Sequence, residues 1–329
     1  MKDCRCDVRV PCKIRKLAAL SLGWLMGMMG CEQGSPPMDP PSPPADALRV
    51  ALGPYPLSPG QETTVCITGY LPNAFPLDVV RVETRQTYSH HVIFYRETDG
   101  VPDAATPSAC PPLDLLSSTR APLFIGETPT ARMDLPAGVA YRLGSKAAYR
   151  IEGHFLNASP QPQQALAEIY LSPAPSGQTM QEADMIFVSA TTQLNKNYDG
   201  KMTGLPPQRD TTIDAAFWPL PSDLKDSKFF ALTSHQHRLG THFSISKSSD
   251  AGAVGQPLYE NTDWEHPKFL MYPQDAPLTF QPGEGFRWVC SFRNTTSGYV
   301  KFGQSAEKDE MCILWGYYYP AQGFRVDFL

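Results

Sequence analysis

Prolines and glycines interrupt this chain so often that long regular elements have little room to form. There are 33 prolines and 24 glycines among 329 residues, and few of the intervening stretches repeat apolar residues with the period of an α-helix. These stretches are short, many alternate apolar with polar residues, and turn-forming residues separate them. The pattern predicts an all-β protein.

The strand candidates fall into two series along the chain. They are residues 63–70, 90–96, 147–157, 165–172, 184–191, 229–237, 242–247, 285–292 and 311–319. Their spacing is typical of β-sandwiches. A break at "PAPSGQTMQE", residues 173–182, predicts two domains, 47–177 and 182–329, which share no clear sequence repeat.

The N-terminus predicts an export signal. Lys13, Arg15 and Lys16 directly precede the apolar run 17–29, which is too short to span a bilayer. The run ends in Gly30 and Cys31, and a small residue directly before Cys is what a bacterial lipoprotein signal offers its peptidase. We therefore expect residues 1–31 to be a lipoprotein signal peptide ending at the lipidated Cys31. The protein would be exported and lipid-anchored in the bacterial cell envelope; plain secretion is the alternative.

A proline-rich segment follows the expected lipidation site. The stretch "SPPMDPPSPP", residues 35–44, has six prolines in ten residues, and such a sequence stays extended without packing. Residues 32–46 are therefore expected to be a tether.

Four cysteines remain beyond the signal and the lipidation site. They are Cys66, Cys110, Cys290 and Cys312. An even number of cysteines in an exported protein predicts two disulfides, and the sequence alone allows three pairings.

Two close pairs stand out among the seven histidines, His90 with His91 and His235 with His237. Residues i and i+2 of a strand point to the same face, so His235 and His237 can reach one metal ion. His90 and His91 would face opposite sides of a regular strand, so both can bind one ion only where the strand ends or bulges. Zinc and copper both accept imidazole. The pairs therefore predict a metal site.

A methionine distinguishes copper from zinc. Met311 lies in "KDEMCILWGYYYP", residues 308–320, and a thioether is a soft ligand that favours Cu(I). If Met311 lies beside His235 and His237, the three form a site suited to copper that changes its oxidation state. Taken alone, a methionine in a strand is more typical of a core.

Five motifs together resemble one protein family. They are "SHHVIFYR" (89–96), "YRIEGHFLN" (149–157), "SHQHRLG" (234–240), "WEHPKF" (264–269) and "DEMCILWGYYYP" (309–320). Their order and approximate spacing resemble those of the copper type II, ascorbate-dependent monooxygenases, which include peptidylglycine α-hydroxylating monooxygenase and dopamine β-hydroxylase. The resemblance covers about residues 60–320 and is strongest from His235 onward.

The resemblance implies two tandem jelly-roll-like β-sandwich domains separated by an open cleft, with one copper in each. The matching ligands are His90, His91 and His154 for the electron-transfer copper of the N-terminal domain, and His235, His237 and Met311 for the oxygen-activating copper of the C-terminal domain. His242 and His266 match no ligand, and we expect them to be structural or to lie behind the ligands.

The resemblance also implies a disulfide between Cys290 and Cys312. It would tie the strand that carries Met311 to a neighbouring strand. Cys66 and Cys110 would then form the second disulfide.

The chain departs from the family where the peptide-hydroxylating members hold the carboxylate of their substrate. Those positions are Thr233, Ile313 and Trp315 here, and threonine cannot make the bidentate contact that arginine makes with a carboxylate. A glycine-extended peptide is therefore not the expected substrate. Ile313 and Trp315 are expected to form an apolar wall of the cleft, and Glu152 stands where the peptide enzymes carry glutamine.

The reaction that the resemblance implies is hydroxylation of an aliphatic C–H bond of a small, fairly apolar substrate. O₂ and ascorbate, or another one-electron reductant, would be the co-substrates. A non-catalytic copper-binding lipoprotein of the envelope would need the same ligands and is the alternative; a zinc hydrolase built on the HxH pair is a third interpretation. The net charge is −5 without Lys/Arg runs, so no nucleic-acid partner is expected, and the lipid anchor is the only expected membrane contact.

Overall fold

The computed structural model describes residues 42, 45–97, 100–111, 120–196, 203–249 and 255–329. The expected signal peptide 1–31, its lipidated Cys31 and most of the tether 32–46 lie outside the described residues. No helix in the described part of the chain is both long and apolar enough to cross a membrane.

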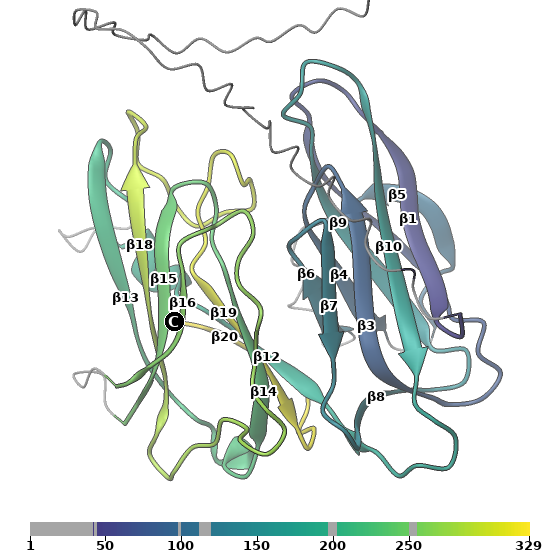
Figure 1. The fold of residues 1–329 in the computed structure, drawn as a ribbon. Helices are drawn as coiled ribbons and strands as arrows, with labels where there is room; N and C mark the ends of the chain where they lie inside the picture. The colour runs from purple at the N-terminus through teal and green to yellow at the C-terminus, as the bar shows by residue number, and fades with distance from the viewer. Residues whose placement is uncertain (1–41, 43–44, 98–99, 112–119, 197–202, 250–254) are drawn as a thin grey trace, which may run out of the picture. The chain divides into compact units, whose positions relative to one another are not determined.

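Strands dominate the described residues and form four sheets, which confirms the all-β prediction (Figure 1). The first sheet has the strand order β1 (Leu48–Leu57), β10 (Gln163–Pro173), β3 (Leu77–Thr87), β8 (Val139–Leu143) and β11 (Gln181–Glu182), with β7 (Thr130–Asp134) also paired to β3. The second sheet has the order β5 (Ala104–Ala109), β2 (Glu62–Tyr70), β9 (Ala148–Leu156), β4 (Ser89–Glu97) and β6 (Arg120–Gly126).

The other two sheets come from the second half of the chain. The third has the order β17 (Leu270–Met271), β14 (Lys228–His235), β19 (Ile313–Tyr319), β12 (Asp184–Ser189) and β20 (Arg325–Phe328). The fourth has the order β13 (Arg209–Pro219), β18 (Gly285–Asn294), β15 (Gly240–Ser248) and β16 (Pro257–Asn261). Two short helices, α1 (Thr191–Asn195) and η1 (Ser222–Leu224), connect strands of this half.

The third sheet is buried on both faces. Leu314 and Tyr318 of β19 pack in one apolar cluster with Trp288 of the fourth sheet. Ile313 and Trp315 of the same strand belong to a second apolar cluster, shared with the first two sheets. Successive side chains of a strand point to opposite faces, and a strand buried on both faces reads as an unbroken apolar run. This explains why β19 has the sequence "ILWGYYY".

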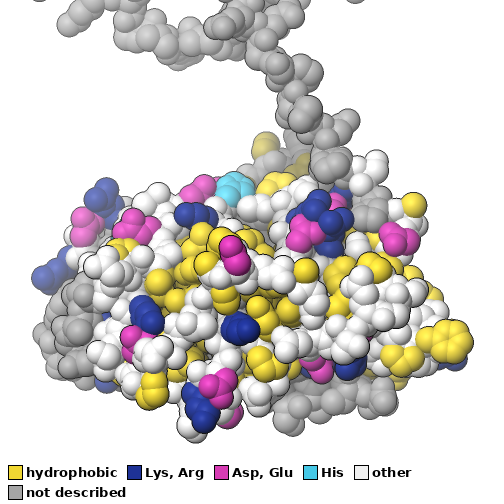
Figure 2. Space-filling model, turned by 60° about the horizontal axis from the view of Figure 1, so that its bottom comes forward, with side chains coloured by type: hydrophobic (Ala, Val, Ile, Leu, Met, Phe, Trp, Pro, Cys, Tyr) yellow, Lys and Arg dark blue, Asp and Glu magenta, His cyan; other side chains and the backbone are white. Residues whose placement is uncertain are grey.

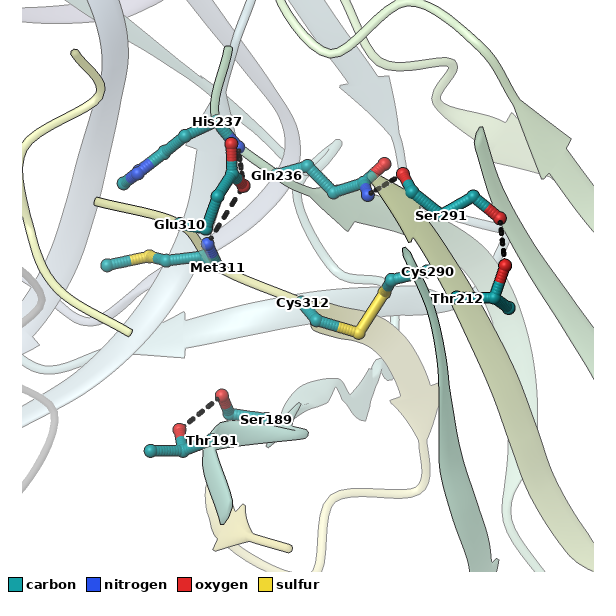
Figure 3. Close-up of a disulfide and its surroundings, with 10 residues drawn as sticks. All are labelled: Ser189, Thr191, Thr212, Gln236, His237, Cys290, Ser291, Glu310, Met311 and Cys312. Carbon is teal, nitrogen blue, oxygen red and sulfur yellow. Dashed lines mark hydrogen bonds between the residues drawn. A yellow bond between two sulfur atoms is a disulfide. The ribbon is translucent and has the colours of Figure 1, made fainter. Parts of the chain in front are cut away.

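Both expected disulfides are present. Cys66 of β2 is bonded to Cys110, directly after β5, with 5.8 Å between their Cα atoms. Cys290 of β18 is bonded to Cys312, directly before β19, with 6.0 Å between their Cα atoms. The second disulfide thus links the third and fourth sheets beside Met311 (Figure 3).

The surface carries charges of both signs. On the face drawn in Figure 2, Lys and Arg side chains alternate with Asp and Glu side chains and with apolar ones. Some of these charges pair across neighbouring strands, as Arg142 of β8 does with Asp78 of β3 at 3.0 Å. Exposed pairs of this kind contribute little to stability.

The same asparagine-centred turn follows a strand in each half of the chain. Asn157 donates hydrogen bonds to three main-chain carbonyl oxygens at 2.8–3.4 Å and accepts two from Ser159 at 2.7 and 3.0 Å. Asn294 donates to three carbonyl oxygens at 2.9–3.1 Å and accepts two from Thr296 at 2.7 and 2.9 Å. The sequence shows no clear repeat, so this correspondence becomes visible only in three dimensions.

We predict that Asn157→Ala and Asn294→Ala each lower the free energy of unfolding by about 2 kcal/mol or more. Both side chains are buried, at 0 % and 1 % exposure, and their loss leaves several buried carbonyl groups without a partner. Urea unfolding followed by fluorescence measures the effect. Thr295→Ala, which changes an exposed side chain of the second turn, is the control and should change stability little; an equal loss in the control would contradict the assignment.

Candidate metal centre

Five of the seven histidines lie together in the structure. They form the histidine cluster, which consists of His90, His91, His154, His235 and His237. The ring centroids of neighbouring members are 4.9–5.5 Å apart. Every member is at most 5 % exposed.

Strand pairing places the first three histidines. His91 of β4 lies directly opposite His154 of β9, and their ring centroids are 5.1 Å apart. The register of this pair of strands shifts between Ser89 and His91. This bulge breaks the alternation of side chains at His90, so the rings of His90 and His91 come within 5.2 Å. The structure thus confirms that the strand is irregular at the HH pair.

The other two histidines lie where the third sheet ends. His235 is the last residue of β14, and His237 lies in the turn before β15. Nδ1 of His237 donates a hydrogen bond to the main-chain oxygen of Asp309 at 3.1 Å. The side chains of His237 and Met311 extend to the same side of their segments (Figure 3).

A buried carboxylate holds the turn that carries His237. Glu310 accepts hydrogen bonds from the main-chain N–H groups of Leu239 at 2.6 Å, His237 at 3.0 Å and Met311 at 3.2 Å. Burial raises the pKa of Glu310 to about 8, although the three N–H bonds oppose the rise. Glu310 thereby fixes His237 and Met311 relative to each other.

Two further carboxylates, which the sequence analysis missed, contact the cluster. Glu127, directly after β6, forms a 2.5 Å hydrogen bond with Nδ1 of His235, and burial raises the pKa of Glu127. Glu62, at the start of β2, accepts a hydrogen bond from Nε2 of His154 at 2.9 Å. Burial acts to raise the pKa of Glu62, but hydrogen bonds from His154 and Ser305 outweigh it and lower that pKa to about 2. Isolated acidic residues have no characteristic spacing, so no sequence signal marked them.

The remaining imidazole nitrogens fit a metal ion. Among the described residues, no protein group hydrogen-bonds to either ring nitrogen of His90 and His91, to Nδ1 of His154, or to Nε2 of His235 and His237. Buried polar atoms without a partner are costly and uncommon. One nitrogen from each of His90, His91 and His235 lies within 4.8 Å of the other two. The cluster therefore offers the nitrogen donors that a metal ion with imidazole ligands requires.

Burial keeps four histidines of the cluster neutral in the folded protein at pH 7: His90, His91, His235 and His237. Burial lowers the pKa of His235 to about 3. Burial, reinforced by the neighbouring histidines, also lowers the pKa values of His90, His91 and His237 well below 6.5. A neutral imidazole keeps the lone pair that a metal ion needs.

The arrangement differs from the expected open cleft between two separate ligand sets. The rings of His90 and His235, from different halves of the chain, are 4.9 Å apart, and those of His90 and His237 are 5.3 Å apart. The apolar cluster shared by the first three sheets, together with the bond between Glu127 and His235, holds the two ligand sets against each other.

Ile313 and Trp315 do not line a cleft as we expected. Both are fully buried in the shared apolar cluster, and the Trp315 ring meets the Phe187 ring edge-on at 4.8 Å. The reason is that β19 is flanked by β14 and β12 and covered on both faces.

The other two residues expected at the cleft are also buried. Thr233 of β14 donates a hydrogen bond from its hydroxyl to the main-chain oxygen of Lys268 at 3.1 Å. Glu152 of β9 accepts one from the Tyr95 hydroxyl at 3.0 Å, inside the second sheet. Neither contact leads to the histidine cluster.

A cavity of about 310 Å³ adjoins the cluster at a different place. His90, Glu127, Trp264, Tyr88 and His266 are among its lining residues. The Trp264 ring lies 5.6 Å from the ring of His90, and Tyr88 is exposed. The cavity therefore offers a small molecule a way to one edge of the cluster, and it gives His266 a position beside the ligands.

The fold and this site together define an all-β protein with a buried polyhistidine centre that is suited to a metal ion. Residues 201–327 match the family model of the copper type II ascorbate-dependent monooxygenase, C-terminal domain. The match supports the resemblance that the motifs from His235 onward indicated, over this part of the chain. This similarity supports a monooxygenase-type function that depends on copper.

No curated protein matches the chain. Among solved structures, the major capsid protein P2 of bacteriophage PM2 is similar at 12 % identity and a TM-score of 0.31, over 84 % of this chain and 100 % of that one. The VP2 subviral particle of infectious bursal disease virus is similar at 10 % identity and a TM-score of 0.19, over 83 % and 71 %. Scores this low carry no argument about fold or function.

We predict that the metal-free protein loses stability as the pH falls below about 6.5. Imidazoles titrate near pH 6.5 in the unfolded chain, whereas burial keeps the pKa of His235 at about 3 in the folded state. As the pH falls below about 6.5, protons therefore bind the unfolded state first. In this range each such histidine lowers the free energy of unfolding by about 1.4 kcal/mol per pH unit. The stabilising contribution of each such histidine is fully present above about pH 6.5. Glu310, whose raised pKa acts with the opposite sign, offsets part of the loss between its unfolded value of 4.5 and about 8.

Urea unfolding of chelator-treated protein at pH 7, 6 and 5 tests this prediction. His235→Asn should flatten the dependence on pH, because it removes one proton that binds only to the unfolded state. His242→Asn, outside the cluster, should leave the slope unchanged. The same slope in wild type and His235→Asn would show that this histidine is not buried in its neutral form.

Proposed function

We propose that this protein is a copper-dependent monooxygenase that hydroxylates an aliphatic C–H bond of a small substrate. The observation that carries the proposal is the buried histidine cluster, whose member His237 is held together with Met311 by Glu310, in a chain whose residues 201–327 match a copper monooxygenase domain. The reaction converts C–H and O₂ to C–OH and water and consumes two electrons and two protons. Ascorbate or another one-electron reductant would supply the electrons.

Two copper positions follow from the ligand types. We assign His90, His91 and His154 to one copper, and His235, His237 and Met311 to the other. The unpartnered ring nitrogens support metal binding by these histidines, the division into two sets rests on the family resemblance, and the soft thioether favours Cu(I) at the second position. Copper bound at the two positions would cycle between Cu(II) and Cu(I) and so deliver the electrons one at a time.

The protein's own groups prepare the ligands. The hydrogen bond between Glu127 and Nδ1 of His235 directs Nε2 of that ring towards the cluster. The bond from Nδ1 of His237 to Asp309 does the same for the Nε2 atom of His237. Burial of the cluster keeps bulk water away from the ligands.

The size of the adjoining cavity supports a small substrate. About 310 Å³ is at the lower end of the usual range for ligand pockets. Its lining mixes Trp264 and Leu156 with the polar Glu127 and His266, which suits a molecule with both apolar and polar parts. The fairly apolar substrate inferred from Ile313 and Trp315 has less support, because both residues are buried.

A non-catalytic copper-binding lipoprotein, for storage, delivery or sensing, remains the alternative because it would use the same ligands. Reductant-dependent O₂ consumption that increases with a C–H substrate separates the two functions. Copper binding without such consumption, across a panel of small substrates, would favour the binding protein.

We predict that the wild-type protein binds two coppers per chain and that His154→Ala binds one. The reduced wild type should show a copper–sulfur shell in X-ray absorption, which is lost in Met311→Ala but retained in His154→Ala, because Met311 supplies the only soft ligand proposed. Metal analysis after loading gives the stoichiometry. His242→Ala, which removes a histidine outside the cluster, is the matched control. A single copper in wild type, or zinc bound in preference to copper, would contradict the two-copper assignment.

We further propose that the protein is exported and lipid-anchored in the bacterial cell envelope through Cys31. The apolar run that ends at Gly30 and Cys31 supports this location, and the proline-rich segment after it would hold the folded part away from the membrane.

We predict that Cys31→Ser produces a protein that no longer incorporates radiolabelled fatty acid and no longer sediments with membranes. Cys12→Ser, which changes a cysteine ahead of the apolar run, is the control and should keep both properties. Fatty-acid labelling that persists in Cys31→Ser would exclude lipidation at this residue.

A further inference from the structure

We propose that Glu62 is a positioning residue that makes the two ligand sets of the metal centre depend on each other. It orients His154 directly, and through the segment 305–311 it also holds His237 and Met311. The inference rests on the proposed copper function for its consequences, but the contacts that carry it belong to the protein alone.

The carboxylate of Glu62 binds groups from both halves of the chain. Its Oε1 accepts hydrogen bonds from Nε2 of His154 at 2.9 Å and from the main-chain N–H of Ala306 at 2.6 Å. Its Oε2 accepts one from the Ser305 hydroxyl at 2.6 Å. Glu62 itself lies on β2 of the second sheet, where Thr64, two residues further on, is opposite His154. Glu62 therefore connects the second sheet to the segment that leads to Met311.

The contact with His154 determines which ring nitrogen is free. When the neutral ring donates from Nε2 to Glu62, the lone pair is on Nδ1, and Nδ1 has no protein partner among the described residues. A carboxylate that binds the far nitrogen of a metal-binding imidazole fixes its tautomer and ring orientation and raises its basicity. Glu62 thus presents His154 to the cluster through Nδ1.

The contacts with Ser305 and Ala306 continue to the other ligand set. The main-chain N–H of Asp309 donates to the Ser305 oxygen at 2.9 Å, and the Asp309 carboxylate accepts from the Ser305 N–H at 3.2 Å. The turn 305–309 is therefore closed on itself. Its last residue, Asp309, accepts the hydrogen bond from Nδ1 of His237 at 3.1 Å.

The next residue completes the path to the thioether. Glu310 binds the main-chain N–H groups of His237 and Met311 with one carboxylate oxygen. A displacement of the turn 305–309 is therefore passed to both residues. Loss of Glu62 should loosen His154, His237 and Met311 together, although Glu62 contacts only the first of them.

A simple structural role would predict something different. An ion pair that only adds stability would, when removed, lower the unfolding midpoint and leave the surviving contacts of the folded state unchanged. Glu168 offers such a comparison. It pairs with Arg49 at 2.6 Å on the first sheet, and its side chain is 20 % exposed, close to the 18 % of Glu62.

The first test needs no metal. Amide hydrogen exchange of the metal-free full chain should accelerate at least tenfold at Ala306 and at Met311 in Glu62→Ala, while amides in the core of β18 stay protected. The ¹⁵N chemical shifts of the His154 ring should move away from the Nε2–H tautomer in this variant. Glu62→Gln, which keeps one acceptor oxygen, should restore part of the protection, and Glu168→Ala should change neither measurement. Faster exchange at Ala306 alone, with Met311 unaffected, would overturn the connection between the ligand sets.

The second test uses copper-loaded protein. Glu62→Ala should change the Cu(II) electron paramagnetic resonance signal of the His154 site and weaken the copper–sulfur shell of the reduced protein. Its copper affinity should fall on the order of 10–100-fold. Two coppers with unchanged spectra in Glu62→Ala would overturn this inference and leave the proposed function intact. Failure of the wild type to bind copper would overturn the proposed function, and the exchange experiment would still decide whether Glu62 connects the two segments.

Discussion

The site depends on the burial of the third sheet on both faces. Leu314 and Tyr318 of β19 pack towards the fourth sheet, while Ile313, Trp315 and Tyr317 pack into the apolar cluster shared with the first two sheets. Removing that much apolar surface from water holds the ends of β14 and β19 against the second sheet. The last residue of β14, His235, is paired with the first residue of β19, Ile313. The histidines of both halves meet beside this pair.

Once the strands are in place, carboxylates set the chemistry of the imidazoles. Glu62 and Glu127 each bind one ring nitrogen and leave the other free, and Glu310 holds the turn that carries His237. Burial keeps the rings of His90, His91, His235 and His237 neutral, so their free nitrogens can bind a metal ion. The centre thus consists of polar groups in an apolar setting, and hydrogen bonds orient three of its rings, those of His154, His235 and His237.

Much of this site was predictable from local sequence. The adjacent pair His90 and His91 required an end or a bulge of the strand, because the period of a strand is two residues. The shared face expected for His235 and His237 assumed a strand through both, whereas β14 ends at His235 and His237 lies in the turn after it. Met311 was predicted to be a soft ligand only in combination with His235 and His237, because a methionine in a strand is by itself more typical of a core, and Met311 is buried in the shared apolar cluster. Glu62 and Glu127 were not predictable, because they reach histidines 92 and 108 residues away in sequence through tertiary contacts. Trp315 was misplaced because an apolar residue on a strand can face a cleft or a core, and its sequence neighbours are the same in both cases.

By itself, the sequence determined the all-β class, an end or bulge of the strand at His90 and His91, and the similarity of the C-terminal part to a copper monooxygenase domain. These are properties of short segments, and the alternation of side chains or the chemistry of one residue type decides them. Only the tertiary structure decided that the two histidine sets lie together, that Ile313 and Trp315 belong to a core, and that Glu62 links His154 to the segment before Met311. Those outcomes depend on which faces of distant strands are packed against each other, and long-range packing leaves no periodic trace in the chain.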